Sequence, residues 1–257
     1  MKHLYITLIM MLVTSMANAQ CPDSNHPHAI DLGLPSGTKW ACCNVGATTP
    51  EGFGNYYAWG ETKEKERYDW ATYIHCDGTA ETCHDIGLDI AGTEYDVAHV
   101  LWGKSWEMPT HEQIQELVSN CSCTWTKINE VGGHLFTGPN GRTVFLPESD
   151  YWREPWDGND VQEEDDYMLP PEDMIPNNGS FWSSTRHTSK PGAGYCLHVS
   201  YGEVFGDYYN YRDMGLTVRP VTSGIIGQPV RGDMDGDGRV SIKDVMDIID
   251  IILTGKE

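Results

Sequence analysis

One stretch near the C-terminus, residues 233–244 (DMDGDGRVSIKD), restricts the local fold more than any other part of this 257-residue chain. Its aspartates repeat at every second position, and Gly238 stands at position 6, where a calcium-binding loop turns sharply. Ca²⁺ prefers six to eight hard oxygen ligands, which such a spacing can direct at one point. A solvated acidic turn would explain neither the spacing nor the glycine. We therefore expect Ca²⁺ as a cofactor, held by Asp233, Asp235, Asp237, Arg239 (backbone carbonyl), Ser241 and Asp244.

The residues that flank this loop indicate the kind of calcium module. After the loop, apolar residues recur at helical spacing, at Ile242, Val245, Ile248, Ile249, Ile252 and Leu253. Before it, residues 225–232 (IIGQPVRG) contain two glycines and a proline, which exclude an entering helix. The pattern therefore predicts a loop followed by one helix, over residues 232–257.

This loop–helix segment resembles the type I dockerin repeat, matched at Asp233, Asp235, Asp237, Ser241 and Asp244. A complete dockerin carries two such repeats, whereas one is found here. The resemblance implies a half-dockerin that docks through its helix, with a cohesin-like protein or a surface protein as the expected partner.

Composition and the N-terminus indicate an exported protein. Residues 1–19 combine Lys2, an apolar run and an Ala17-Asn18-Ala19 cleavage site, which together predict a signal peptide. The net charge of −21 argues against nucleic acid as a partner, because nucleic-acid binding needs a basic patch. No later apolar run is long enough to span a membrane. We expect a secreted or cell-surface protein.

The chain has eight cysteines, and an even number in an exported protein suggests disulfides. Their connectivity cannot be read from the sequence. Cys76 and Cys83 are the first candidates, since they could close a short surface loop.

Between the signal peptide and a linker at residues 223–231, residues 20–222 predict one α+β domain. Asp96 could cap a short helix over 96–101, and Thr110 with Gln113 predicts a capping box at the start of a second helix. Turn residues at 138–141 predict a hairpin between strands at 134–137 and 143–146. Further strands are expected at 40–46, 181–184, 195–201, 204–209 and 216–221.

Several blocks of this domain occur in the same order in a known family. They are residues 32–41 (LGLPSGTKWA), 44–52 (NVGATTPEG), 57–62 (YAWGET), 102–110 (WGKSWEMPT), 181–184 (FWSS) and 218–221 (VRPV). The domain resembles the "major paralogous" domain (FISUMP) of exported bacterial proteins, over about residues 29–221. That resemblance implies a C-type-lectin-like fold related to the formylglycine-generating enzymes. The chain departs from the pattern at Glu107, where arginine is usual, and at residues 148–152.

Catalytic patterns are incomplete. The helix that begins at His111 has Gln115 where a zinc protease needs its second histidine. Formylglycine-generating enzymes use two cysteines, but Cys196 stands alone in the corresponding region. The acidic run at 163–166 is more typical of a solvated tract than of a glycosidase pair. No catalytic residue is assigned.

Aromatic residues outside the family blocks are candidates for ligand contact, because exposed rings stack on sugars; they are Trp152, Trp156, Tyr208, Tyr209 and Tyr211. The same rings could instead hold the long segment 148–179 against the domain. The combined hypothesis is a secreted, calcium-binding, non-catalytic module that binds glycan or protein in polysaccharide utilisation. The alternatives are an accessory or catalytic component of a glycoside hydrolase system, or a structural surface adhesin.

Overall fold

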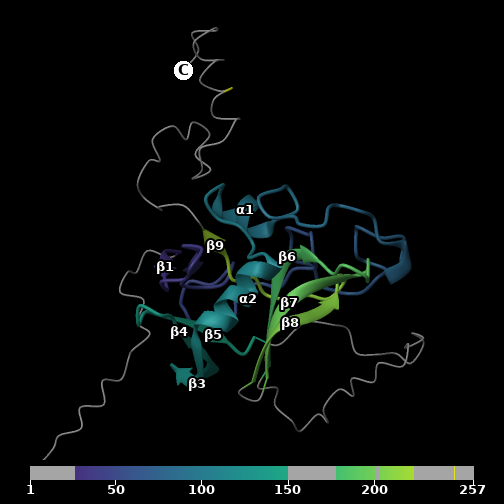
Figure 1. Ribbon diagram of the computed structural model, residues 1–257. Coiled ribbons are helices and arrows are strands. Elements are labelled where there is room, and N and C mark those ends of the chain that lie inside the picture. The colour runs from purple at the N-terminus through teal and green to yellow at the C-terminus, as the bar shows by residue number, and fades with distance from the viewer. Residues whose placement is uncertain (1–26, 150–177, 201–202, 223–245, 247–257) are drawn as a thin grey trace, which may run out of the picture.

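The structure is a computed structural model that describes residues 27–149, 178–200, 203–222 and Met246. This part of the chain consists mostly of antiparallel strands with few helices (Figure 1). The strands form three sheets of three, in the orders β1-β2-β9, β3-β4-β5 and β6-β7-β8. At this level the architecture agrees with the predicted α+β class.

The smallest sheet joins the two ends of the described domain. It contains β1 (Ala29–Asp31), β2 (Lys39–Ala41) and β9 (Val221–Thr222). Trp40 at the centre of β2 faces Ile30 on one side and Val221 on the other. Because β2 pairs with both terminal strands, the domain is closed by residues far apart in the sequence.

The second sheet is a meander of β3 (Ser122–Ile128), β4 (Val131–Thr137) and β5 (Thr143–Pro147). Asn129 and Glu130 both have positive φ, 47° and 67°, as a two-residue hairpin turn requires. The predicted hairpin between β4 and β5 is confirmed. Gly138 is needed there because a Cβ atom would lie 2.1 Å from the Leu32 carbonyl oxygen.

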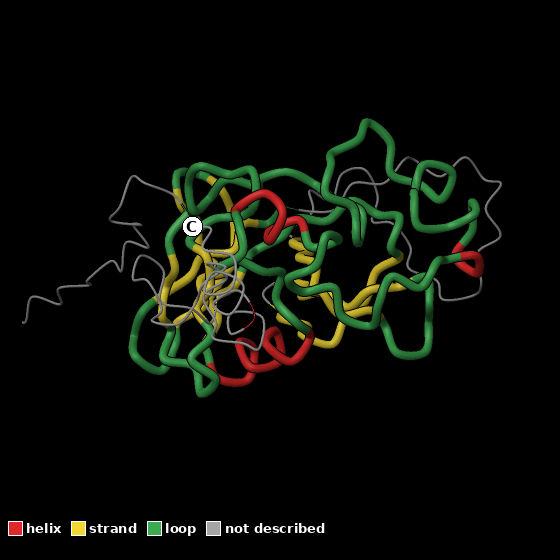
Figure 2. The backbone as a smooth tube through the Cα atoms, turned by 90° about the horizontal axis from the view of Figure 1, so that it is seen from above, coloured by secondary structure: helices red, strands yellow, loops and turns green. Residues whose placement is uncertain are grey.

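The third sheet contains the longest strands, β6 (Asn178–Arg186), β7 (Ala193–Ser200) and β8 (Glu203–Tyr211). β6 is buried along most of its length, whereas β8 consists mostly of exposed and partly buried residues, with only Gly206 buried. Figure 2 shows the two larger sheets as separate groups of strands, with α2 running along one side.

Both predicted α-helices are present with the predicted caps. In α1 (Val97–Trp102), the Asp96 carboxylate accepts hydrogen bonds from the first-turn backbone. In α2 (His111–Asn120), Thr110 and Gln113 form the capping box. A single 3₁₀ turn, η1 (Ala80–Thr82), lies in the long connection before α1.

Two main hydrophobic clusters fill the domain. The first places Ile114 and Leu117 of α2 against the sheets of β4–β5 and β6–β7. The second surrounds Trp59 and Trp182. Trp40, Trp59, Trp106 and Trp182 are buried, and Trp102 packs partly buried against the second cluster. The first cluster thus packs α2 against both larger sheets, and β7 and β8 belong to one of these sheets.

Candidate ligand-binding surface

A continuous row of aromatic and imidazole rings follows β7 and β8. We call this row the aromatic belt, and it consists of His111, His187, Tyr195, His198, Phe205, Tyr208 and Tyr209. The rings come from the start of α2, the β6–β7 connection, β7 and β8. No single segment of sequence contains them all, so the fold creates the row.

The first part of the belt is a stack of three rings. Tyr195 lies parallel to His111, with ring centroids 4.0 Å apart and an interplanar angle of 4°. His187 stacks against Tyr195 at 4.8 Å. Tyr195 therefore stacks with both histidines and links His111 to His187.

The second part continues along β8. His187 meets Tyr209 edge to face at 4.8 Å, and Tyr209 lies 6.3 Å from Tyr208. Tyr208 stacks on His198 at 4.5 Å, and Phe205 lies 6.0 Å from His198. A register shift between Cys196 and His198 in the β7–β8 pairing brings Phe205 and Tyr208, three residues apart, to the face of the sheet that carries His198. Tyr209 pairs with Tyr195 and lies on the opposite face, towards α2.

Polar groups lie beside the belt and orient its rings. The Lys190 ammonium sits over the Tyr209 ring, 4.4 Å from its centroid, and donates a hydrogen bond to the Tyr209 hydroxyl. His111 Nε2 lies 3.1 Å from Asp207 Oδ1 and 3.2 Å from the Gln115 side-chain nitrogen. The Ser180 hydroxyl and His198 Nδ1 are 2.9 Å apart.

Two of the belt imidazoles are neutral at pH 7. Burial lowers the pKa of His198 to about 4. Burial, assisted by the nearby Lys190 ammonium, also lowers the pKa of His187. These two members of the belt therefore present uncharged rings at neutral pH.

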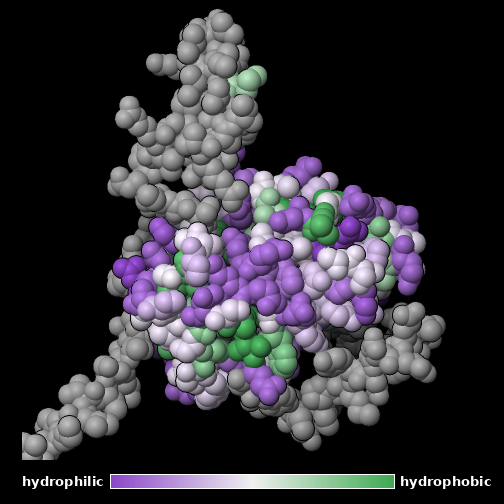
Figure 3. Space-filling view, viewed as in Figure 1, coloured by the Kyte–Doolittle hydropathy of each residue, from purple (hydrophilic) through white to green (hydrophobic). Residues whose placement is uncertain are grey.

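The β8 part of the belt reaches the surface. In the described part of the chain β8 is an outer strand of its sheet, and Phe205 has 40% of its surface exposed. Figure 3 shows a mostly hydrophilic face with several hydrophobic areas, one of which lies between β5 and β8. Exposed rings on a rigid strand are suited to ligand contact.

The predicted ligand residues divide into three groups. Tyr208 and Tyr209 belong to the belt. Tyr211 is exposed but lies outside it, edge to face with Trp70 at 6.0 Å. Trp152 and Trp156 lie outside the described residues. Sequence reasoning missed the remaining belt members, although His187, Tyr195, His198 and Phe205 fall in the same aromatic-rich stretch as the tyrosines.

Two reactive side chains near the belt are not arranged for catalysis. Ser180 and His198 form a serine–histidine pair, but the serine is 99% buried and no carboxylate of the described residues bonds to the imidazole. Cys196 is fully buried, and burial raises the pKa of its thiol far above the usual range. Neither side chain can meet a substrate as a nucleophile.

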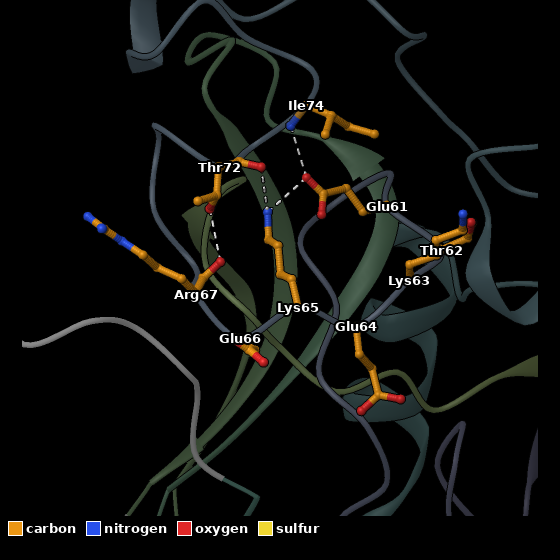
Figure 4. A pocket seen from close by; sticks show the side chains of 9 residues that line it. All are labelled: Glu61, Thr62, Lys63, Glu64, Lys65, Glu66, Arg67, Thr72 and Ile74. Carbon is orange, nitrogen blue, oxygen red and sulfur yellow. Dashed lines mark hydrogen bonds and ion pairs between the residues drawn. The ribbon is translucent and has the colours of Figure 1, made fainter.

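A pocket of about 600 Å³ lies on the loop at residues 61–74 (Figure 4). Lys65 bonds to the Glu61 carboxylate at 2.9 Å and to the Thr72 carbonyl at 3.2 Å, and Ile74 N–H donates to the same Glu61 oxygen. Glu61 is only 6% exposed. Within the charged run at residues 63–67 (KEKER), Lys65 therefore turns inward. The ion pair holds this loop, and charges of both signs line the pocket.

The predicted calcium ligands, Asp233 to Asp244, lie outside the described residues. Within residues 27–149, 178–200 and 203–222, no group of acidic, histidine or cysteine side chains is arranged to hold a metal ion. No helix in the same ranges is long and apolar enough to cross a membrane. Comparison with known proteins finds no matching protein-family model, curated protein or solved structure.

Proposed function

We propose that this chain is an exported, calcium-binding, non-catalytic module that binds glycan through the aromatic belt. The observation that carries the proposal is the chain of ring contacts in the belt: seven rings from four separate segments follow one another, and Phe205, at the β8 end, is 40% exposed.

The chemistry of the belt suits a carbohydrate. Aromatic faces carry a partial negative charge that attracts the C–H groups on the flat side of a sugar ring. The hydroxyls of Tyr208 and Tyr209 add groups that can accept and donate hydrogen bonds. Because His187 and His198 are neutral at pH 7, these parts of the belt present no charge that would demand an ionic ligand.

The remaining features of the proposal rest on the sequence. The family resemblance supports a C-type-lectin-like domain over residues 20–222, and the three antiparallel sheets with two helices are compatible with it. The loop at 233–244 would bind Ca²⁺, and the helix after it would dock on a cohesin-like or surface protein. Residues 1–19 would direct export.

A glycan array tests the binding step. Residues 20–257, with calcium present, should retain plant and host oligosaccharides, and the strongest oligosaccharide should then give a dissociation constant by calorimetry. Phe205→Ala should weaken that binding about fivefold, because one stacked ring contributes about 1 kcal/mol. Phe53→Ala is the matched control, since Phe53 is 45% exposed and lies outside the belt.

The outcomes separate the hypotheses. Loss of binding in Phe205→Ala with retained binding in Phe53→Ala supports the belt as the binding surface. Equal affinities in both variants would reject the belt. Release of reducing sugar by the purified chain would instead favour the glycoside hydrolase alternative, and an array without any bound glycan would reject glycan as the ligand.

A further inference from the structure

A short loop before α1 is held closed by hydrogen bonds on both sides of two cysteines. The His84 N–H donates to the His75 carbonyl at 2.8 Å. Two positions further in on each side, the Asp77 N–H donates to the Thr82 hydroxyl at 3.0 Å. Because residues 75 and 84 are joined, and residues 77 and 82 are joined, Cys76 and Cys83 lie opposite each other between the two bonds.

Both sulfur atoms also lie against the same small cluster. Cys76 and Cys83 pack, partly buried, on Ala58, Tyr68 and Tyr73. Burial raises the pKa of Cys83 to about 11, with the Arg212 guanidinium opposing the shift and the Cys76 sulfur adding to it. The two cysteines, which are free thiols in the structure, therefore lie in the same small cluster.

The other cysteines of the described domain are less suited to pairing. Cys42, Cys43 and Cys196 are at most 1% exposed, whereas Cys76 and Cys83 are partly exposed and an oxidant can reach them in the folded protein. Cys121 and Cys123 are near each other, but they belong to the C-cap of α2 and the start of β3. A bond between them would close a ring with one intervening residue and would join no separate segments.

We infer that Cys76 and Cys83 form a disulfide in the exported protein. Formation removes one proton and one electron from each thiol and creates one S–S bond. A small-molecule disulfide such as oxidised glutathione accepts both protons and both electrons and leaves as two thiols. The loop loses weak sulfur contacts: the Cys76 sulfur lies 3.4 Å and 3.5 Å from the carbonyl oxygens of Trp70 and Tyr73 and accepts from the Gly78 N–H at 3.3 Å, and the Cys83 sulfur lies 4.0 Å from the Thr79 carbonyl oxygen.

The bond would close a ring of eight residues, 76–83, and fix this loop beside Arg212. The His84 carbonyl accepts a hydrogen bond from Arg212 at 3.2 Å, so opening the loop would release one partner of a buried guanidinium. For a ring of this size, chain-entropy reasoning predicts that the bond raises the folding equilibrium constant about 50-fold.

Peptide mapping tests the assignment directly on the full chain. Trypsin should release residues 68–104 as one peptide, which contains Cys76 and Cys83 and no other cysteine. In protein folded with oxidised and reduced glutathione and alkylated without reduction, this peptide should be two hydrogen masses lighter than its thiol form. A further cut after Glu81 should leave two fragments that separate only on reduction. Alkylation of both thiols before reduction, or linkage of either to another cysteine, would overturn the inference.

A stability measurement provides a second test. Dithiothreitol should lower the folding equilibrium constant of the wild-type chain about 50-fold, and the doubly substituted Cys76→Ser/Cys83→Ser chain should show no such response. Cys121→Ser/Cys123→Ser is the matched control and should respond as the wild type does. A wild-type chain that is insensitive to dithiothreitol, or a control that loses its sensitivity, would contradict the inference.

Discussion

Replacing Asp96 by alanine should destabilise the domain more than replacing any exposed aspartate. Asp96 is completely buried, and its two carboxylate oxygens accept four backbone hydrogen bonds. Oδ1 accepts from Ala98 at 2.9 Å and His99 at 3.1 Å, which caps α1. Oδ2 accepts from Gly92 and Met108, both at 2.9 Å. One side chain thus joins the start of α1 to the loops before and after it.

The size of the effect follows from these four bonds. Losing a helix cap costs about 1 kcal/mol. Leaving the Gly92 and Met108 N–H groups without their acceptor adds about 1–3 kcal/mol each. Because water can enter the space left by the carboxylate, the lower part of this range applies, and we expect a loss of about 4 kcal/mol in the free energy of unfolding. For a domain of this size that corresponds to a fall of about 12 °C in Tm.

Chemical denaturation and thermal unfolding at pH 7.5 measure this loss. Burial raises the pKa of Asp96 to about 6, so the carboxylate is still ionised at that pH. Asp89→Ala is the matched control, because exposed Asp89 accepts one backbone hydrogen bond, from Ala91 at 3.0 Å, and should cost less than about 1 kcal/mol. Equal losses in the two variants would refute the argument that the buried carboxylate joins the two loops to α1.

Two further predictions concern pH and calcium. The folded-state pKa of His198 is about 4, below the unfolded value of about 6.5, so its contribution to stability is present above pH 6.5 and is lost as pH falls towards 4. Between pH 7 and pH 4 the wild type should lose about 2 kcal/mol more than His198→Gln, after allowance for partial exposure, and equal losses by chemical denaturation would contradict this. Asp233→Ala should strongly weaken calcium binding in calorimetry, whereas Asp207→Ala should not; unchanged affinity in Asp233→Ala would exclude the loop as the site.

The elements that the sequence predicts well depend on residues close together in the chain. Thr110 and Gln113 form both halves of a capping box within one turn of α2. Asp96 caps α1 by accepting hydrogen bonds from Ala98 and His99, two and three residues further along the chain. The β4–β5 hairpin follows from a turn of four residues. Such signals need no knowledge of the tertiary fold.

The strands predicted at 40–46 and 216–221 are shorter in the structure, because the pairing of these segments depends on residues far apart in the chain. After Ala41 the chain leaves the sheet, and the Val45 N–H bonds to the Val218 carbonyl at 3.0 Å across two irregular segments. Arg219 is fully buried and donates to Asn44 Oδ1 at 2.7 Å. Pairing between loops distant in sequence leaves no alternation that a strand pattern could detect.

Only the part of the belt that is local in the sequence was predictable. Tyr208 and Tyr209 stand out as neighbouring aromatics, but His111 was considered only as a zinc ligand that lacks its second histidine. Its actual partner, Tyr195, lies on β7, and only packing of α2 against the third sheet brings the two rings together. The inward turn of Lys65 could not be predicted from the sequence, because its ion-pair partner Glu61 looks there like any other surface carboxylate.

The proposed disulfide and the proposed binding surface are connected through one buried residue. Arg212 follows directly after β8, and its guanidinium donates to the Tyr73 hydroxyl at 2.8 Å, the His84 carbonyl at 3.2 Å and the Pro191 carbonyl at 3.1 Å. Pro191 follows Lys190, whose ammonium covers the Tyr209 ring. A closed loop at residues 76–83 would therefore hold the end of β8 and the β6–β7 connection in one arrangement. Reduction should loosen both, so glycan affinity should fall on reduction only if the belt and the disulfide are both assigned correctly.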